Sequence, residues 1–131
     1  MASVVDKRGL NLGDSIAVYS ADQASWLTGA GYAISEEVIE MYGMVRAIAI
    51  RISEVTGNPT VVVTLTDANG NEIYNSGSIA DGTDYHYTPT EFLPTAEAFP
   101  VGGDITVGIT PSADAGGTGQ ELTVDVDIYL E

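Results

Sequence analysis

The sequence predicts an all-β fold: a single antiparallel β-sandwich, jelly-roll-like, with an extended N-terminal arm. The first observation is strict alternation of apolar and polar residues, which buries one face of a pleated strand and leaves the other in water. The second is the turn chemistry between the alternating runs, which is rich in Gly, Pro and Asn. The third is the length, because 131 residues suffice for one hydrophobic core and hardly for two.

The N-terminal part of the chain divides into an arm and the first strands. Residues 1–14 form the expected arm and residues 15–131 the sandwich domain, in which Ser15–Ser20 is a short strand candidate. The segment Ser35–Gly43 is ambiguous, because a first serine, early acids and a final glycine also suit a short helix. Its β-branched residues and its direct run into residues 44–55 favour one long bent strand with a bulge at the glycine.

The middle of the chain predicts a hairpin. Ile48–Ile52 alternates, and Val61–Thr66 alternates again after a Gly-Asn-Pro turn. Asn69-Gly70 tolerates the positive φ values that a tight hairpin turn requires, so Val61–Thr66 is expected to pair with Glu72–Asn75. A further short strand is expected around Asp84–Thr88.

The C-terminal part contains the clearest alternation. Ile105–Thr110 is one run, and Leu122–Glu131 is the longest. In the latter we expect the leucines, valines and isoleucine on a dry face, and Asp125, Asp127 and Tyr129 on a wet face. The Gly-rich segment Ala113–Gly119 between the two runs is expected to be a flexible, solvated connection.

The charge excludes some partners. The chain carries 19 acidic residues against 4 Lys and Arg, a formal charge of −15, which repels nucleic-acid phosphates and anionic membranes. We therefore expect no nucleic-acid and no membrane partner. Two of the four bases, Lys7 and Arg8, lie in the arm, where they could reach an acidic neighbour or simply belong to a frayed terminus.

The residues needed for catalysis are scarce. The only histidine is His86, and the sequence lacks the nucleophile-elbow, zinc-protease and phosphate-loop motifs. Without cysteine, neither a disulfide nor a thiolate metal site is available. We expect a protein that is not an enzyme and needs no cofactor.

One oxygen-rich loop begins like a calcium-binding loop. Asp67, Asn69, Asn71 and Glu72 have the early spacing of such a loop, but Ser78 stands at its twelfth position, where a bidentate Glu is needed. A plain hairpin turn explains the same residues. Calcium binding is therefore a weak alternative.

Two apolar features lie outside the strand pattern. Trp26 is expected in a loop, where it could anchor an interface or plug the core. The Pro-rich stretch Thr88–Pro100 contains Phe92, Leu93 and Phe99. Such a stretch either caps one end of a sandwich or is buried against another subunit.

The order of the motifs over residues 38–131 resembles small structural proteins of tailed bacteriophages. The resemblance rests on Gly43–Ile52, Val55-Thr56-Gly57, Val61–Tyr74, and the ending from Asp104–Val107 through a Gly-rich loop to Val124–Leu130. It implies a head decoration, or cement, protein.

Such a non-enzymatic protein binds the outer capsid surface of the virion and stabilises the shell, often as a homotrimer. Its partner is the major capsid protein. On this interpretation Lys7 and Arg8 contact the capsid, and Trp26 or the loop with Phe92, Leu93 and Phe99 forms the subunit interface.

Two other functions fit the same fold. A carbohydrate-binding or adhesin-like module would need coplanar exposed aromatic rings. A calcium-tuned extracellular fibre subunit would use the acidity and the loop at Asp67–Glu72, and calcium would then raise the melting temperature.

Overall fold

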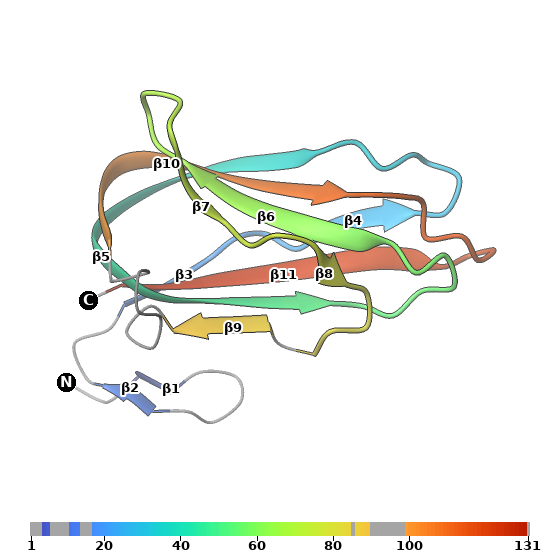
Figure 1. Ribbon diagram of the computed structural model, residues 1–131, viewed down its shortest axis with the longest axis horizontal. Coiled ribbons are helices and arrows are strands. Elements are labelled where there is room, and N and C mark those ends of the chain that lie inside the picture. The colour runs from blue at the N-terminus through green and yellow to red at the C-terminus, as the bar shows by residue number, and fades with distance from the viewer. Residues whose placement is uncertain (1–3, 6–10, 14–16, 85, 90–98, 131) are drawn as a thin grey trace.

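The computed structural model describes residues 4–5, 11–13, 17–84, 86–89 and 99–130, and within these ranges it consists of strands and loops without a helix. Every strand pair is antiparallel, which confirms the predicted all-β fold (Figure 1). The strands are β1 (Val4–Val5), β2 (Asn11–Gly13), β3 (Ala17–Ser20), β4 (Ala24–Leu27), β5 (Ser35–Ile52), β6 (Thr60–Thr66), β7 (Glu72–Asn75), β8 (Ile79–Ala80), β9 (His86–Pro89), β10 (Phe99–Pro111) and β11 (Glu121–Leu130).

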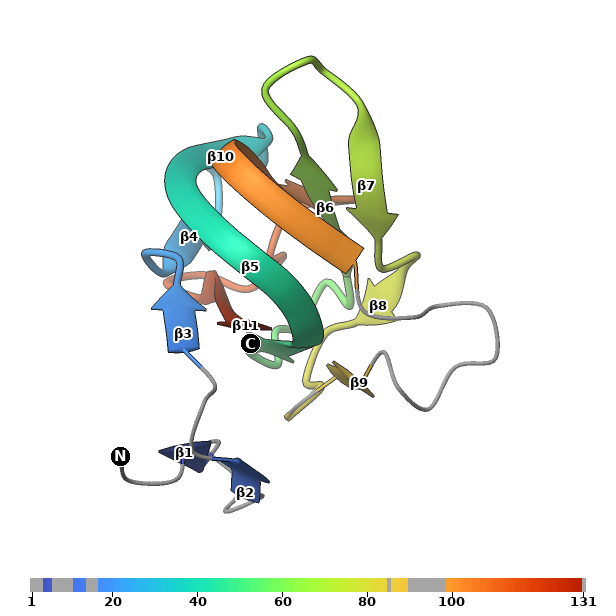
Figure 2. The same cartoon turned by 90° about the vertical axis from the view of Figure 1, so that its left-hand side faces the viewer.

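One sheet folds over itself to make the sandwich. Its strand order is β3-β11-β5-β10-β6-β7, with β4 also paired to β11, β8 to β6 and β9 to β5. Among the described strands, β1 and β2 pair with each other and with no other strand. Residues 35–45 of β5 pair with β10, and residues 45–52 pair with β11. The curved strand β5 therefore belongs to both layers (Figure 2). One layer continues into β10 and β6, and the other into β11, β3 and β4.

The expected long bent strand is confirmed, but its bulge lies elsewhere. Pairing between β5 and β10 runs without interruption through Gly43, whose φ is 134°. The register shifts on the other edge, where Tyr129 pairs with Ala47 and Leu130 pairs with Val45. This leaves Arg46 as the extra residue of the bulge. The glycine supplies an unusual backbone angle for the bend instead, which a residue with Cβ rarely adopts.

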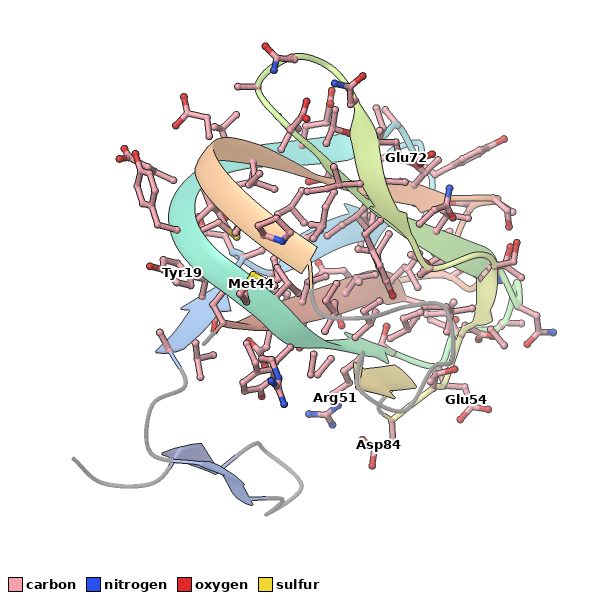
Figure 3. The ribbon with its side chains drawn as sticks, turned by 60° about the vertical axis from the view of Figure 1, so that its left-hand side comes forward. Tyr19, Met44, Arg51, Glu54, Glu72 and Asp84 are labelled. Carbon is pink, nitrogen blue, oxygen red and sulfur yellow. The ribbon has the colours of Figure 1, made fainter. Side chains whose placement is uncertain are left out.

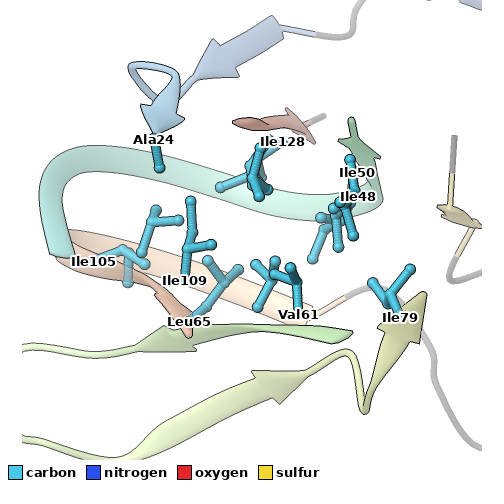
Figure 4. Packing of buried hydrophobic residues seen from close by; sticks show 14 of the residues in the cluster. Ala24, Ile48, Ile50, Val61, Leu65, Ile79, Ile105, Ile109 and Ile128 are labelled. Carbon is cyan, nitrogen blue, oxygen red and sulfur yellow. The ribbon is translucent and has the colours of Figure 1, made fainter. Parts of the chain in front are cut away.

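The core lies between the two layers and follows the predicted alternation. Side chains from β5 and β11 meet side chains from β6 and β10 (Figure 4). The predicted pairing of Val61–Thr66 with Glu72–Asn75 is also confirmed. The largest fully buried side chains are Tyr129, Met41, Ile48, Ile50, Leu65, Leu122, Ile128, Leu130, Val45, Val61, Val63 and Val107.

The face of β11 that we expect to be exposed to solvent is exposed over only part of its length. Asp125 is partly exposed, but Asp127 and Tyr129 retain only 3% and 2% of their accessible surface. Asp127 accepts a 2.6 Å hydrogen bond from the Ser20 hydroxyl, which supplies the donor that a buried carboxylate requires. Alternation identifies which side chains share a face, and it cannot reveal that this second face is covered as well.

The Gly-rich connection between β10 and β11 is anchored to the protein, contrary to the expectation of a free, solvated tip. Ala115 is fully buried, and its carbonyl accepts a hydrogen bond of 2.6 Å from the Gly57 N–H. The Gln120 side chain accepts a hydrogen bond of 2.7 Å from the Thr56 N–H. The loop after β5 and the loop after β10 therefore hold each other at one end of the sandwich.

Gly57 leaves no room for a side chain at this loop contact. A Cβ at this position would lie 2.6 Å from the Asp114 carbonyl oxygen and 2.8 Å from that of Ala115. We expect Gly57→Ala to lower the free energy of unfolding by about 1–3 kcal/mol, measured by urea denaturation. Gly102→Ala is the control, because a Cβ there has its nearest contact at 3.8 Å. Equal stabilities of the two variants would contradict this account of the loop contact.

Candidate interaction surface

The exposed large apolar side chains are concentrated in one part of the chain. Seven such side chains occur among the residues whose burial the structure describes, and all lie between residues 18 and 44. Strands β6, β7, β8 and β11 contribute none in the same ranges. Large exposed apolar groups on adjoining elements mark interaction sites more often than scattered ones do. The seven are Val18, Leu27, Tyr32, Ile34, Val38, Tyr42 and Met44.

These residues border one long side of the sandwich, which we name the open side. Its borders are β3 and β4, on the outer edge of β11, and residues 35–44 of β5 in the other layer. The two borders are linked at one point, where a Glu37 carboxylate oxygen accepts a hydrogen bond of 3.1 Å from the Asp22 N–H. Tyr19 of β3 and Met44 of β5 mark the two borders in Figure 3.

The outward row of β5 alternates acidic and apolar residues along the open side. Glu36, Val38, Glu40, Tyr42 and Met44 are all exposed, and the valine and tyrosine keep 61% and 62% of their accessible surface. The tyrosine pairs in register with Gly102 of β10, so its direct cross-strand neighbour has no side chain to cover it. The result is a ridge of carboxylates and apolar groups.

The open side is acidic as well as apolar. Between residues 17 and 45, all of which the structure describes, the sequence contains four acidic residues and no Lys, Arg or His. Asp104 of β10 stands in register with Glu40 and adds another carboxylate. The nearest basic residue along the chain, Arg46, belongs to the bulge, and Arg51 lies 3.4 Å from the Asp84 carboxylate. The field along this surface therefore favours a cationic partner.

Residues 35–44 of β5 form a sheet edge. On one side they pair with β10, while pairing with β11 ends at Val45. Among the described ranges, no strand pairs with their other side. An edge strand presents backbone N–H and C=O groups to whatever approaches it.

Of the residues predicted for the capsid contact and the subunit interface, the structure describes Trp26 and the backbone of Phe99. Trp26 of β4 lies at the open side, half-buried against the core, and its indole N–H donates a hydrogen bond of 2.8 Å to the Ala33 carbonyl. Lys7, Arg8, Phe92 and Leu93 lie outside the described residues. Phe99 is the first residue of β10 and pairs with Val45, and its side chain is not described.

The loop Asp67–Asn71 is a hairpin turn whose carboxylates have partners within the hairpin. The backbone N–H groups of Asn69 and Asn71 each donate a 2.9 Å hydrogen bond to the same Asp67 oxygen, and Glu72 accepts one from Asn75. The positive φ that the turn requires occurs at Gly70, with a value of 84°, and not at Asn69. Across the described residues, no three acidic or His side chains gather as a metal site would need.

Asp67 makes the hairpin sensitive to acid. The N–H groups of Asn71 and Asn69 hold the pKa of this carboxyl below its ordinary value of 3.8, because they bond the ionised form. The stability that it contributes is therefore present above that value and lost as pH falls through the lowered pKa. We expect Asp67→Ala to lower the urea midpoint at neutral pH. The difference in midpoint from wild type closes as pH falls below 3.8. Thr118→Ala, an exposed change on another loop that removes no ionisable group, is the control.

Tyr42 reports the electrostatics of the open side. Its hydroxyl donates a 2.8 Å hydrogen bond to Glu40, and this bond and the carboxylate charge raise the pKa of the phenol above 10.0. We expect Glu40→Gln to lower the pKa of Tyr42, measured by NMR with tyrosine labelled at Cζ. Glu72→Gln, on β7, serves as the control. A phenol pKa that is the same in wild type and Glu40→Gln would contradict the contact.

Sequence reasoning missed this surface, although a signal was present. Residues 35–44 carry apolar residues in both alternating rows, with Ile39 and Met41 on one side and Val38, Tyr42 and Met44 on the other. One row suffices for packing against a core. The second row, together with its acids, indicates a strand whose outer face has a further use.

Comparison with known proteins gives similarity of structure but not of sequence. No protein-family model and no curated protein sequence matches the chain. Among solved structures, it is similar to the VP2 subviral particle protein of infectious bursal disease virus, with a TM-score of 0.46 and 13% identity over 98% of this chain. The chain spans 36% of that protein's length.

A second similar structure is a prophage-derived protein of about the same size. The SPBc2 prophage-derived protein YomS has a TM-score of 0.42 and 16% identity, and the match covers 85% of this chain and 95% of that one. A structure of T=1 particles derived from infectious bursal virus gives a TM-score of 0.41 at 12% identity. Likenesses at these scores establish no family membership and no function.

Proposed function

We propose that this protein is a non-enzymatic structural protein that binds the outer surface of a bacteriophage capsid and stabilises the shell. The observation that carries the proposal is the open side, where the exposed large apolar groups of the described residues gather on an otherwise polar sandwich. A rigid antiparallel framework with one acidic and apolar side suits docking. The motif order over residues 38–131, which resembles phage decoration proteins, supplies the class of partner.

The physical chemistry of a shell suits this role. A capsid repeats one binding site many times, so contacts of modest strength add up when subunits bind as symmetric oligomers. A trimer that places three open sides on the lattice would use this effect, with the major capsid protein as partner. The arm with Lys7 and Arg8 would supply a second contact of opposite charge.

The direct test is reconstitution on stripped particles. Particles from the source culture are stripped mildly of this chain, and the purified protein is added back. Density-gradient separation and quantitative mass spectrometry then measure its copy number relative to the major shell protein. We expect saturation at a fixed ratio and an unchanged shell. Absence of the chain from native particles together with no rebinding would overturn the proposal.

Variants connect the binding to the open side. We expect Val38→Ser with Tyr42→Ser to weaken binding to stripped particles about tenfold, because each change removes an exposed apolar contact. Their melting temperature stays near that of wild type, because neither side chain is in the core. Thr118→Ala, on the exposed loop after β10, is the matched control. Lys7→Glu with Arg8→Glu tests the arm separately.

A further inference from the structure

The backbone of the open side has the form of a strand acceptor. Residues 35–44 of β5 are extended, pair with β10 on one side and have no strand partner on the other among the described residues. Such edges bind extended peptides through main-chain hydrogen bonds, and alternate side chains then supply specificity. Natural proteins protect such edges with charged side chains, lysine above all, or with proline. This edge contains neither lysine nor proline, and its charges are all glutamates, which repel an acidic strand and attract a basic one.

The outward row of β5 defines what an added strand must carry. Glu36 and Glu40 alternate with Val38 and Tyr42 along it. In an added strand, every second side chain would lie beside this row, at the Cβ separation of cross-strand neighbours. Basic residues would meet the two glutamates, and apolar residues would meet Val38 and Tyr42.

A second copy of this chain does not fit this edge. Self-pairing through the same residues would bring the glutamates of two copies close together, in a chain with a formal charge of −15. Like charges on neighbouring strands destabilise a sheet. Charge complementarity therefore selects a different protein with a basic segment.

We propose that residues 35–44 of β5 receive an added β-strand from a partner protein, whose neighbouring row alternates basic and apolar residues. The inference rests on the proposed function in that the partner is a shell subunit. The apolar residues of that strand cover Val38 and Tyr42, and its bases replace the solvent around Glu36 and Glu40. Binding of the basic strand weakens at high salt, as exposed charge pairs do.

A synthetic peptide tests the recognition without any shell. Its ends are blocked, lysine and valine alternate at every second position, and threonine fills the positions between. We expect binding by the full-length protein, with slowed amide hydrogen exchange at alternate residues within 35–44 and no change in β6. A peptide with glutamate in place of lysine is the charge control.

The decisive control removes backbone donors and keeps the side chains. A peptide with alternate amides N-methylated on its pairing edge retains every charge and apolar group, but it cannot complete the ladder. We expect it to bind at least about tenfold more weakly, since several hydrogen bonds are lost. Failure of the lysine peptide to bind, equal affinity of the N-methylated peptide, or protection outside residues 35–44 would overturn the proposal.

Cross-linking on particles separates this inference from the proposed function. The chain has no cysteine, so Ala33→Cys, exposed just before the β5 edge, and Ala80→Cys each give one attachment point for a photoreactive label. Ala80 is exposed on β8, at the far edge of its layer. We expect only the first label to capture a shell segment with alternating bases. Particles that bind the protein but link through Ala80 would overturn strand addition and leave the shell function intact. Peptide binding without particle binding would overturn the shell function and leave strand addition at the β5 edge intact.

Discussion

The fold depends on one requirement: the alternation of core-facing residues in β5 must shift by one position where the strand passes from one layer to the other. Met41 and Val45 point into the core before the crossing, and Ile48 and Ile50 point into it afterwards. An uninterrupted strand would keep odd residues on one face throughout. The extra residue Arg46 shifts this phase by one, so both halves of the strand present apolar side chains to the same core. Without the shift, the second half would direct its isoleucines away from this core, to the face that Ala47 and Ala49 occupy.

The same crossing creates the open side. Because β11 pairs only with the second half of β5, the first half keeps an edge without a strand partner among the described residues. The acids and apolar groups of its outward row lie along that edge, and the hydrogen bond from Asp22 to Glu37 links it to the neighbouring border. A feature needed to close the core thus also determines where a partner can approach. Architecture and binding surface cannot be changed independently here.

The sequence predicted most strands because alternation reports directly on burial. Three of the alternating runs lie within observed strands, namely Val61–Thr66, Ile105–Thr110 and residues 122–130 of the last run. The choice of strand over helix at Ser35–Gly43 is confirmed. Three features could not be predicted from this pattern. The position of the bulge depends on pairing with β11, burial of Asp127 and Tyr129 depends on what covers a second face, and the unpaired edge of β5 depends on which strands lie beside it. All three arise from strand order, which alternation leaves undetermined.

The two kinds of turn described above have opposite consequences for engineering the protein. Composition suggests the Gly-rich segment before β11 as the place to insert an epitope, but its contact with Gly57 makes it part of the framework. The hairpin tip at Asn69 and Gly70 is exposed and projects from the body of the sandwich (Figure 1). A foreign peptide carried there would leave the contact between the two loops at Gly57 intact, so a cargo could be displayed without disturbing that end of the framework.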